Sequence, residues 1–185
     1  MVILQFVGQY IKHPRKVGAV HPSSRKLAHQ TVAFVDFESA ECIVEYGLGT
    51  GVFTELLVQR KHGDTKLLVF ESNRKFYEIL QRRFGGMENV HIIHDSAEHV
   101  GRYVEQYGIG KVSHVVSGLP FTSLPREVSE RILQETRNVL GMEGEFVTFQ
   151  YSKLKQVYFN SFFSDIQINK VLQNIPPAYV FKCSR

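Results

Sequence analysis

Three glycines at alternate positions are the first residues of this sequence whose types and spacing favour ligand chemistry. Gly47, Gly49 and Gly51 follow an apolar run that contains one acid, Glu45, and they precede a second apolar run. Glycines between a strand and a helix let backbone amides approach a bound ligand closely. The spacing differs from the dinucleotide-binding pattern G-x-G-x-x-G, because Val52 holds the third glycine position, and no Gly-Lys-Ser or Gly-Lys-Thr follows for a phosphate loop. The glycines predict a cofactor-binding turn of another kind, although Gly51 also suits close helix packing.

Acidic residues also follow the next two apolar runs. Glu71 lies in VFES and Asp95 in HDSA. A carboxylate is a strong acceptor for the hydroxyl and amino hydrogens of a ligand. Each acid also suits an ordinary role as a helix N-cap or a solvated strand end, and both interpretations stay open at this point.

The elements that must position these residues alternate along the chain between short apolar runs and amphipathic runs. We expect seven strands, over residues 42–46, 67–71, 90–94, 112–117, 145–151, 166–172 and 178–183. We expect helices over residues 53–61, 74–84, 96–107 and 154–163, and a further helix that Ser123 caps and the sequence GMEG ends. Strands alternating with helices favour a parallel sheet with right-handed crossovers.

The composition limits the class of protein. A chain of 185 residues with 43% hydrophobic residues predicts one domain, 1–185, with an N-terminal segment 1–30 and a sheet core 40–185. A net charge of +4 suits a phosphate-bearing partner. Two cysteines and no long apolar stretch predict a cytoplasmic protein. We expect no metal, because no ligand cluster supports His91, His94 and His99, and no obligate protein partner is evident.

The sequence VEYGLGTG, with the two later acids in the same order, resembles the class I S-adenosylmethionine-dependent methyltransferases. The resemblance implies an α/β, Rossmann-like fold with a seven-stranded, mostly parallel sheet, helices on both faces and an antiparallel last strand. It implies S-adenosylmethionine as cofactor, with the glycine turn at its methionyl end, Glu71 on the ribose hydroxyls and Asp95 on the adenine amino group. Further cofactor contacts are implied for Glu45, Ser72, Ser96, Ala97 and Ser117, and for His21, Pro22 and Ser23, which would close over the methionine carboxylate.

The acceptor is indicated by the sequence VVSGLPF. Enzymes of this class that methylate an amino nitrogen often carry Asn or Asp, then Pro or Leu, then Pro and an aromatic residue, and here the four residues are Gly118, Leu119, Pro120 and Phe121. The proline fixes a turn, and Phe121 has the chemistry to stack on a base or lie over a cationic nitrogen, while its alternative role is a core phenylalanine. Gly118 replaces the side chain that would accept adenine amino protons, which disfavours an adenine acceptor.

Over nearly the whole chain the sequence resembles the soluble bacterial phospholipid N-methyltransferases, through HPRKVGAVHPSSRKLA, SGLPF, FQYS and NIPPAYVFKCSR. The expected substrate is therefore the amine of phosphatidylethanolamine, with ribosomal RNA adenine as the alternative and a non-catalytic cofactor-binding factor as the second alternative. The apolar residues of the segment 2–11 are placed so that a helix would carry them on one face, and the basic KHPRK follows; they are Val2, Ile3, Phe6, Val7, Tyr10 and Ile11. This pattern is typical of an interfacial helix that docks at the inner membrane face, or of a helix that packs over the sheet. Tyr151 is a candidate donor or acceptor near the amine, and a half-buried tyrosine at a strand end is the alternative.

Overall fold

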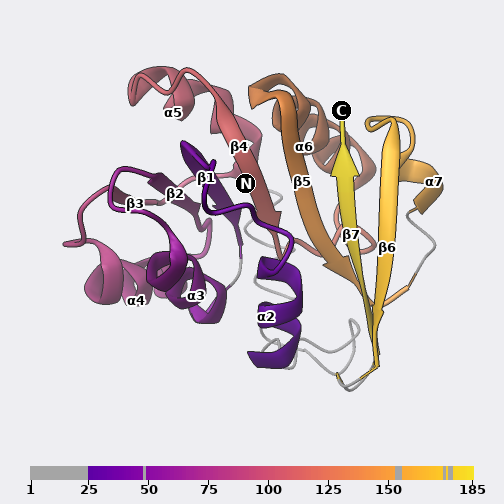
Figure 1. Cartoon of the computed structure of the whole chain (residues 1–185), viewed down its shortest axis with the longest axis horizontal. Coiled ribbons are helices and arrows are strands. Elements are labelled where there is room, and N and C mark those ends of the chain that lie inside the picture. The colour runs from indigo at the N-terminus through magenta and orange to yellow at the C-terminus, as the bar shows by residue number, and fades with distance from the viewer. Residues whose placement is uncertain (1–24, 48, 153–155, 173, 175–176) are drawn as a thin grey trace.

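The computed structural model describes residues 25–47, 49–152, 156–172, 174 and 177–185. Its seven strands form one sheet in the order β3-β2-β1-β4-β5-β7-β6 (Figure 1). The strands are β1 (Cys42–Tyr46), β2 (Lys66–Phe70), β3 (Val90–Ile93), β4 (Val112–Ser117), β5 (Leu140–Gln150), β6 (Asp165–Val171) and β7 (Ala178–Ser184). Strands β1 to β5 pair with one another in parallel, and β7 lies antiparallel between β5 and β6. The predicted fold class is confirmed.

Helices cover both faces of this sheet. One face packs against α2 (Arg25–Val32), α3 (Val52–Arg60) and α4 (Arg74–Phe84). The other packs against η1 (Ala97–His99), α5 (Val100–Gln106), α6 (Arg126–Val139) and α7 (Gln156–Phe159). Successive residues of β1 alternate between the two apolar cores: Ile43 belongs to the α2–α3–α4 core and Val44 to the α5–α6–α7 core. The apolar run that predicted a strand buried on both faces therefore has that role.

The helix before GMEG ends at Val139, as predicted, but β5 begins before the predicted residue 145 and includes GMEG, where the β4–β5 register shifts between Val112 and His114. Ser123 does not cap α6, because its own amide donates to the Pro120 carbonyl in a separate turn and Pro125 holds the N-cap position. Predicted helix 96–107 is divided into η1 and α5.

Within the described part of the chain, no helix has the length and apolarity needed to span a membrane.

Candidate functional site

The glycine turn lies where the carboxyl ends of three parallel strands meet. The Gly47 amide donates to the Phe70 carbonyl at 2.9 Å, and the Gly118 amide donates to the Tyr46 carbonyl at 3.0 Å. The turn is therefore tied to β2 and β4 as well as to β1. Open α/β sheets bind ligands at this edge, where the order of strands reverses.

Glycine is needed at the three turn positions for different structural reasons. All three have positive φ, at 56° for Gly47, 66° for Gly49 and 88° for Gly51. A Cβ at Gly51 would lie 2.8 Å from Leu80 Cδ2, and one at Gly47 would lie 2.6 Å from Leu119 Cδ2. A Cβ at Gly49 would meet no atom within 4 Å. Gly51 is thus required by helix packing, whereas Gly49 leaves an open approach to the backbone.

Two buried carboxyl groups lie beside this turn. Glu45 is fully buried; its Oε1 accepts a hydrogen bond from Thr54 Oγ1 at 2.7 Å, and its Oε2 has no partner among the described residues. Glu71 is 4% exposed and accepts hydrogen bonds from the amides of Asn73, at 2.7 Å, and Gly49. Burial raises the pKa of Glu45 to about 8, reinforced by the charge of Glu71 and opposed by Thr54. Burial raises the pKa of Glu71 to about 7 against the two amides.

The raised pKa of Glu45 predicts a pH-dependent stability that the Glu45→Gln variant lacks. A carboxyl group whose pKa rises on folding binds its proton more tightly in the folded state. Its contribution to the free energy of unfolding is therefore fully present below about pH 4.5 and is lost as the pH rises through about 8. We expect Glu45→Gln to match the wild type near pH 4.5 and to exceed it at pH 8.5, by on the order of a few kcal/mol, in urea unfolding.

The exposed Glu105→Gln is the matched control for this measurement. It should shift stability by the same small amount at both pH values. If the difference between Glu45→Gln and the wild type were equal at the two pH values, the assigned burial cost of the Glu45 charge would be wrong.

Asp95 follows β3 and is held by three donors. Its Oδ1 accepts from the Ser96 amide at 2.7 Å and lies 2.8 Å from His99 Nδ1, and its Oδ2 accepts from the Tyr103 hydroxyl at 3.0 Å. The Asp95 side chain is 24% exposed. Burial raises the pKa of Asp95, but the hydrogen bonds from His99, Ser96 and Tyr103 outweigh it and lower the pKa below its ordinary value. Asp95 is therefore an ionised acceptor in a fixed orientation.

A hollow opens between these strand ends and α6, with about 360 Å³ of empty space, part of it open to solvent. It brings together six residues predicted from the sequence, namely Gly47, Ser72, Asp95, Ser96, Ala97 and Leu119. Sequence reasoning missed its other walls, Phe70, Leu124, Val128 and Ile132. Val128 and Ile132 belong to the predicted apolar face of α6, but that pattern cannot tell a wall of a hollow from a core contact. One polar side and one apolar side are typical of small-molecule sites.

The turn after β4 is fixed by hydrogen bonds. The Leu119 carbonyl accepts from the Phe121 amide at 3.0 Å and from Gln150 Nε2 at 3.1 Å, and the Pro120 carbonyl accepts from the Ser123 amide at 2.8 Å. Ser117 is fully buried, and its hydroxyl accepts from the Leu119 amide at 3.2 Å. Gln150 is 3% exposed and was not singled out from the sequence. The turn is thus a rigid ledge whose Leu119 side chain forms a wall of the hollow.

Phe121 does not line the hollow, where a role over a base or cation would require its ring to lie. Its ring is fully buried and packs edge to face against Phe146, at 6.0 Å between centroids, and Phe159, at 5.6 Å. The alternative interpretation, a core phenylalanine after a tight turn, matches this position. The side chain of Leu119 lines the hollow, whereas Phe121 two residues later packs into the α5–α6–α7 core.

Tyr151 is not gathered with the hollow either. It packs against the α2–α3–α4 core, and its ring lies nearly perpendicular to that of Phe149, at 6.1 Å between centroids. The apolar residues that line the hollow pack in the α5–α6–α7 core, on the other face of the sheet. His21, Pro22, Ser23 and the apolar face of residues 2–11 lie outside the described residues.

The histidines considered as metal ligands contact aromatic or acidic side chains. His91 packs against Tyr107, at 4.2 Å between ring centroids, and His94 stacks on Tyr77 at 4.9 Å. Within the described ranges, no group of three or more His, Cys, Asp or Glu side chains is arranged to hold a metal ion.

Comparisons with known proteins identify the family. The sequence model of the family "Ribosomal RNA adenine dimethylase" matches residues 15–150. The chain belongs to the ribosomal RNA adenine dimethylase family. This family member is 30% identical to an ornithine lipid N-methyltransferase of Singulisphaera acidiphila over 181 residues, covering 96% of the chain and 93% of the relative. It is 26% identical to the ribosomal RNA small subunit methyltransferase A of Borreliella burgdorferi over 124 residues, covering 66% of the chain and 40% of that relative.

Solved structures support the same fold. A SAM-dependent methyltransferase of Aquifex aeolicus superposes with a TM-score of 0.63 at 10% identity, covering 93% of this chain and 96% of that one. This family member is a methyltransferase that uses S-adenosylmethionine. The described residues fit that cofactor, because a buried carboxylate oxygen of Glu45 lacks a partner and the open side of Gly49 leaves room for a ligand at the backbone.

Proposed function

We propose that this dimethylase-family member transfers the methyl group of S-adenosylmethionine to the amine of a membrane phospholipid of the phosphatidylethanolamine type. The observation that carries the proposal is the share of the chain that each of the two relatives matches. The lipid N-methyltransferase matches 96% of the chain, whereas the ribosomal RNA methyltransferase matches 66% of it and only 40% of its own length is covered. Gly118 supports the same choice, because it supplies no amide side chain to accept adenine amino protons.

The candidate site supports a division of roles toward the cofactor. We propose that Glu71 accepts the ribose hydroxyls, since its carboxylate already accepts the Gly49 amide beside the turn. We propose that Asp95 accepts the adenine amino group, with the adenine in the hollow beside Ser96 and Ala97. The backbone of Gly47 and Gly49 would then lie along the methionyl end.

The methyl group of a sulfonium cofactor is already activated, so the protein mainly has to align an amine lone pair with it. The ledge after β4 is suited to that task. Gln150 and Ser117 hold Leu119 by its carbonyl and its amide, so this wall of the hollow is fixed before a substrate arrives. The side chains of Leu119 and Leu124 line the apolar side of the hollow.

A lipid substrate requires contact with a membrane surface. We propose a peripheral position at anionic membranes, supported by the exposed Arg25 and Lys26 in the first turn of α2 and by the preceding basic KHPRK of the sequence. Each basic residue near such a surface contributes about 1 kcal/mol of attraction.

The test is transfer of labelled methyl from S-adenosylmethionine to vesicles and to RNA in parallel. The vesicles contain phosphatidylethanolamine or ornithine lipid with anionic lipid, and the RNA is unmethylated small-subunit ribosomal RNA. We expect label in the lipid fraction at least about 100-fold above that of the Gly49→Val variant, which serves as the background control.

Label in RNA would overturn the lipid proposal in favour of the ribosomal RNA alternative, which the family match and the Borreliella relative support. Cofactor binding without label in either acceptor would favour the second alternative, a non-catalytic factor.

A further inference from the structure

Asp95 belongs to a continuous hydrogen-bonded group that the reaction itself does not require. His99 and Tyr103 follow it by four and eight residues, and their donors contact opposite oxygens of the same carboxylate: His99 Nδ1 lies 2.8 Å from Oδ1, and the Tyr103 hydroxyl lies 3.0 Å from Oδ2. The Ser96 amide also donates to Oδ1, at 2.7 Å. Oδ1 is therefore filled by two contacts, whereas Oδ2 keeps one acceptor position beyond the described contacts.

The Tyr103 donor is itself locked in place. Its ring packs edge to face on Phe70, at 5.4 Å between centroids and an interplanar angle of 82°, and Phe70 packs in the same way on Tyr46 at 5.9 Å. Phe70 is also a wall of the hollow that Asp95 lines. The position of the Tyr103 hydroxyl is thus set by the same aromatic group that shapes the hollow. The rotation of the Asp95 carboxylate is set by Tyr103 and His99 together with the Ser96 amide.

We infer that His99 and Tyr103 are positioning residues that give the hollow its selectivity for adenine. They hold the Asp95 carboxylate so that the remaining acceptor position of Oδ2 faces the hollow, where a 6-amino hydrogen of the purine would donate to it. This inference rests on the proposed role of Asp95 toward the cofactor. Without these two side-chain donors only the Ser96 amide holds the carboxylate, through Oδ1. The carboxylate keeps its charge, but the direction of Oδ2 is less fixed, so a ligand with the amino group gains less affinity over one without it.

The experiment compares two ligands by calorimetry: S-adenosylhomocysteine, and its purine riboside analogue in which hydrogen replaces the 6-amino group. A hydrogen bond to a charged acceptor corresponds to a preference of about 10- to 100-fold for the amino ligand in the wild type. We expect Tyr103→Phe and His99→Ala each to reduce this ratio by about 3- to 10-fold. His99→Gln keeps a side-chain donor and should restore part of the ratio.

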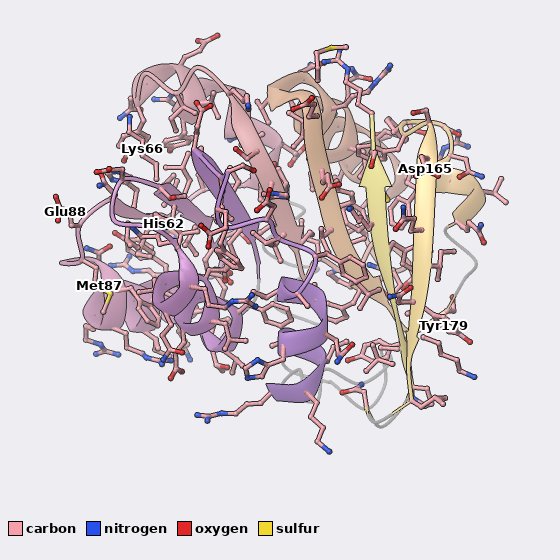
Figure 2. The ribbon with its side chains drawn as sticks, in the orientation of Figure 1. His62, Lys66, Met87, Glu88, Asp165 and Tyr179 are labelled. Carbon is pink, nitrogen blue, oxygen red and sulfur yellow. The ribbon has the colours of Figure 1, made fainter. Side chains whose placement is uncertain are left out.

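Tyr179→Phe is the matched control, since it removes a tyrosine hydroxyl from β7. Figure 2 shows Tyr179 at the opposite end of the sheet from Met87 and Glu88, which precede β3. The control should leave the ratio unchanged. Thermal melting of each variant confirms that it is folded before binding is measured.

The outcomes separate the inference from the function on which it rests. A wild type with no preference for the amino group would remove the adenine role of Asp95, and with it this inference, whatever the methyl acceptor is. A wild-type preference that Tyr103→Phe and His99→Ala leave intact, because both ligands weaken equally, would overturn the positioning role and leave the proposed cofactor contacts standing.

Discussion

The Gly49→Val variant is expected to bind S-adenosylmethionine at least about 100-fold more weakly than the wild type while it remains folded. Gly49 has φ of 66°, where a β-branched residue is strained by on the order of 1–3 kcal/mol. No atom lies within 4 Å of a Cβ at this position, so the strained chain still packs. The same open space is where a ligand would approach the backbone, and valine would fill it. Relief of the strain would also move the amide that donates to Glu71.

Calorimetry with the cofactor and thermal melting check the two halves of this prediction. Gly63→Ala is the matched control, because a Cβ there also meets no atom within 4 Å and its φ is not in the left-handed region. Gly63 lies at the opposite edge of the sheet, before β2, so its substitution should change neither property. Wild-type affinity in Gly49→Val would show that the cofactor does not approach the glycine turn.

The second large effect is expected from Phe121. Phe121→Ala should lower the free energy of unfolding by about 3–5 kcal/mol, because it empties a fully buried site between Phe146 and Phe159. Phe121→Leu keeps most of the volume and should cost less, about 1–2 kcal/mol. Urea unfolding measures both values. The rate of methyl transfer per folded Phe121→Leu molecule should stay within about threefold of the wild type, since the ring does not line the hollow.

A different pattern would restore the role suggested by the sequence. If Phe121→Leu lowered the rate by 100-fold or more with little change in stability, the ring would act on the substrate amine, as a cation–π contact requires. The ledge would then have to rearrange when substrate binds, because Phe121 is buried in the structure described here.

The parallel part of the fold follows from local patterns. Strand β1 is predictable because all five of its residues are buried and the sequence there is mostly apolar. The turn after it is predictable because its three positions with positive φ are glycines. Acids at the ends of adjacent parallel strands must come near one another, so the neighbourhood of Glu71 and Asp95 is also contained in the element order.

Other features depend on contacts between distant residues and have no local signal. GMEG has a turn composition, yet it lies within β5, at the register shift between Leu140 and Glu145, the residues that pair with β4 on either side of it. The direction of Phe121 is decided by Phe146 and Phe159, which are 25 and 38 positions later in the chain. The contact of Gln150 with the Leu119 carbonyl, over 31 residues, likewise joins the end of β5 to the turn after β4, which sequence reasoning treats separately.

The insertion of β7 between β5 and β6 sets an order for assembly of that edge of the sheet. In Figure 1 the arrowheads of β5 and β7 point in opposite directions, and β6 touches the sheet only through β7. Strand β6 is synthesised before β7, but the strand it pairs with among the described residues is β7, so β6 cannot join the sheet until β7 has been made. The parallel half of the sheet, with its glycine turn and acids, does not wait for that step. A nascent chain therefore carries the glycine turn and the acids after β2 and β3 before the edge formed by β7 and β6 is complete.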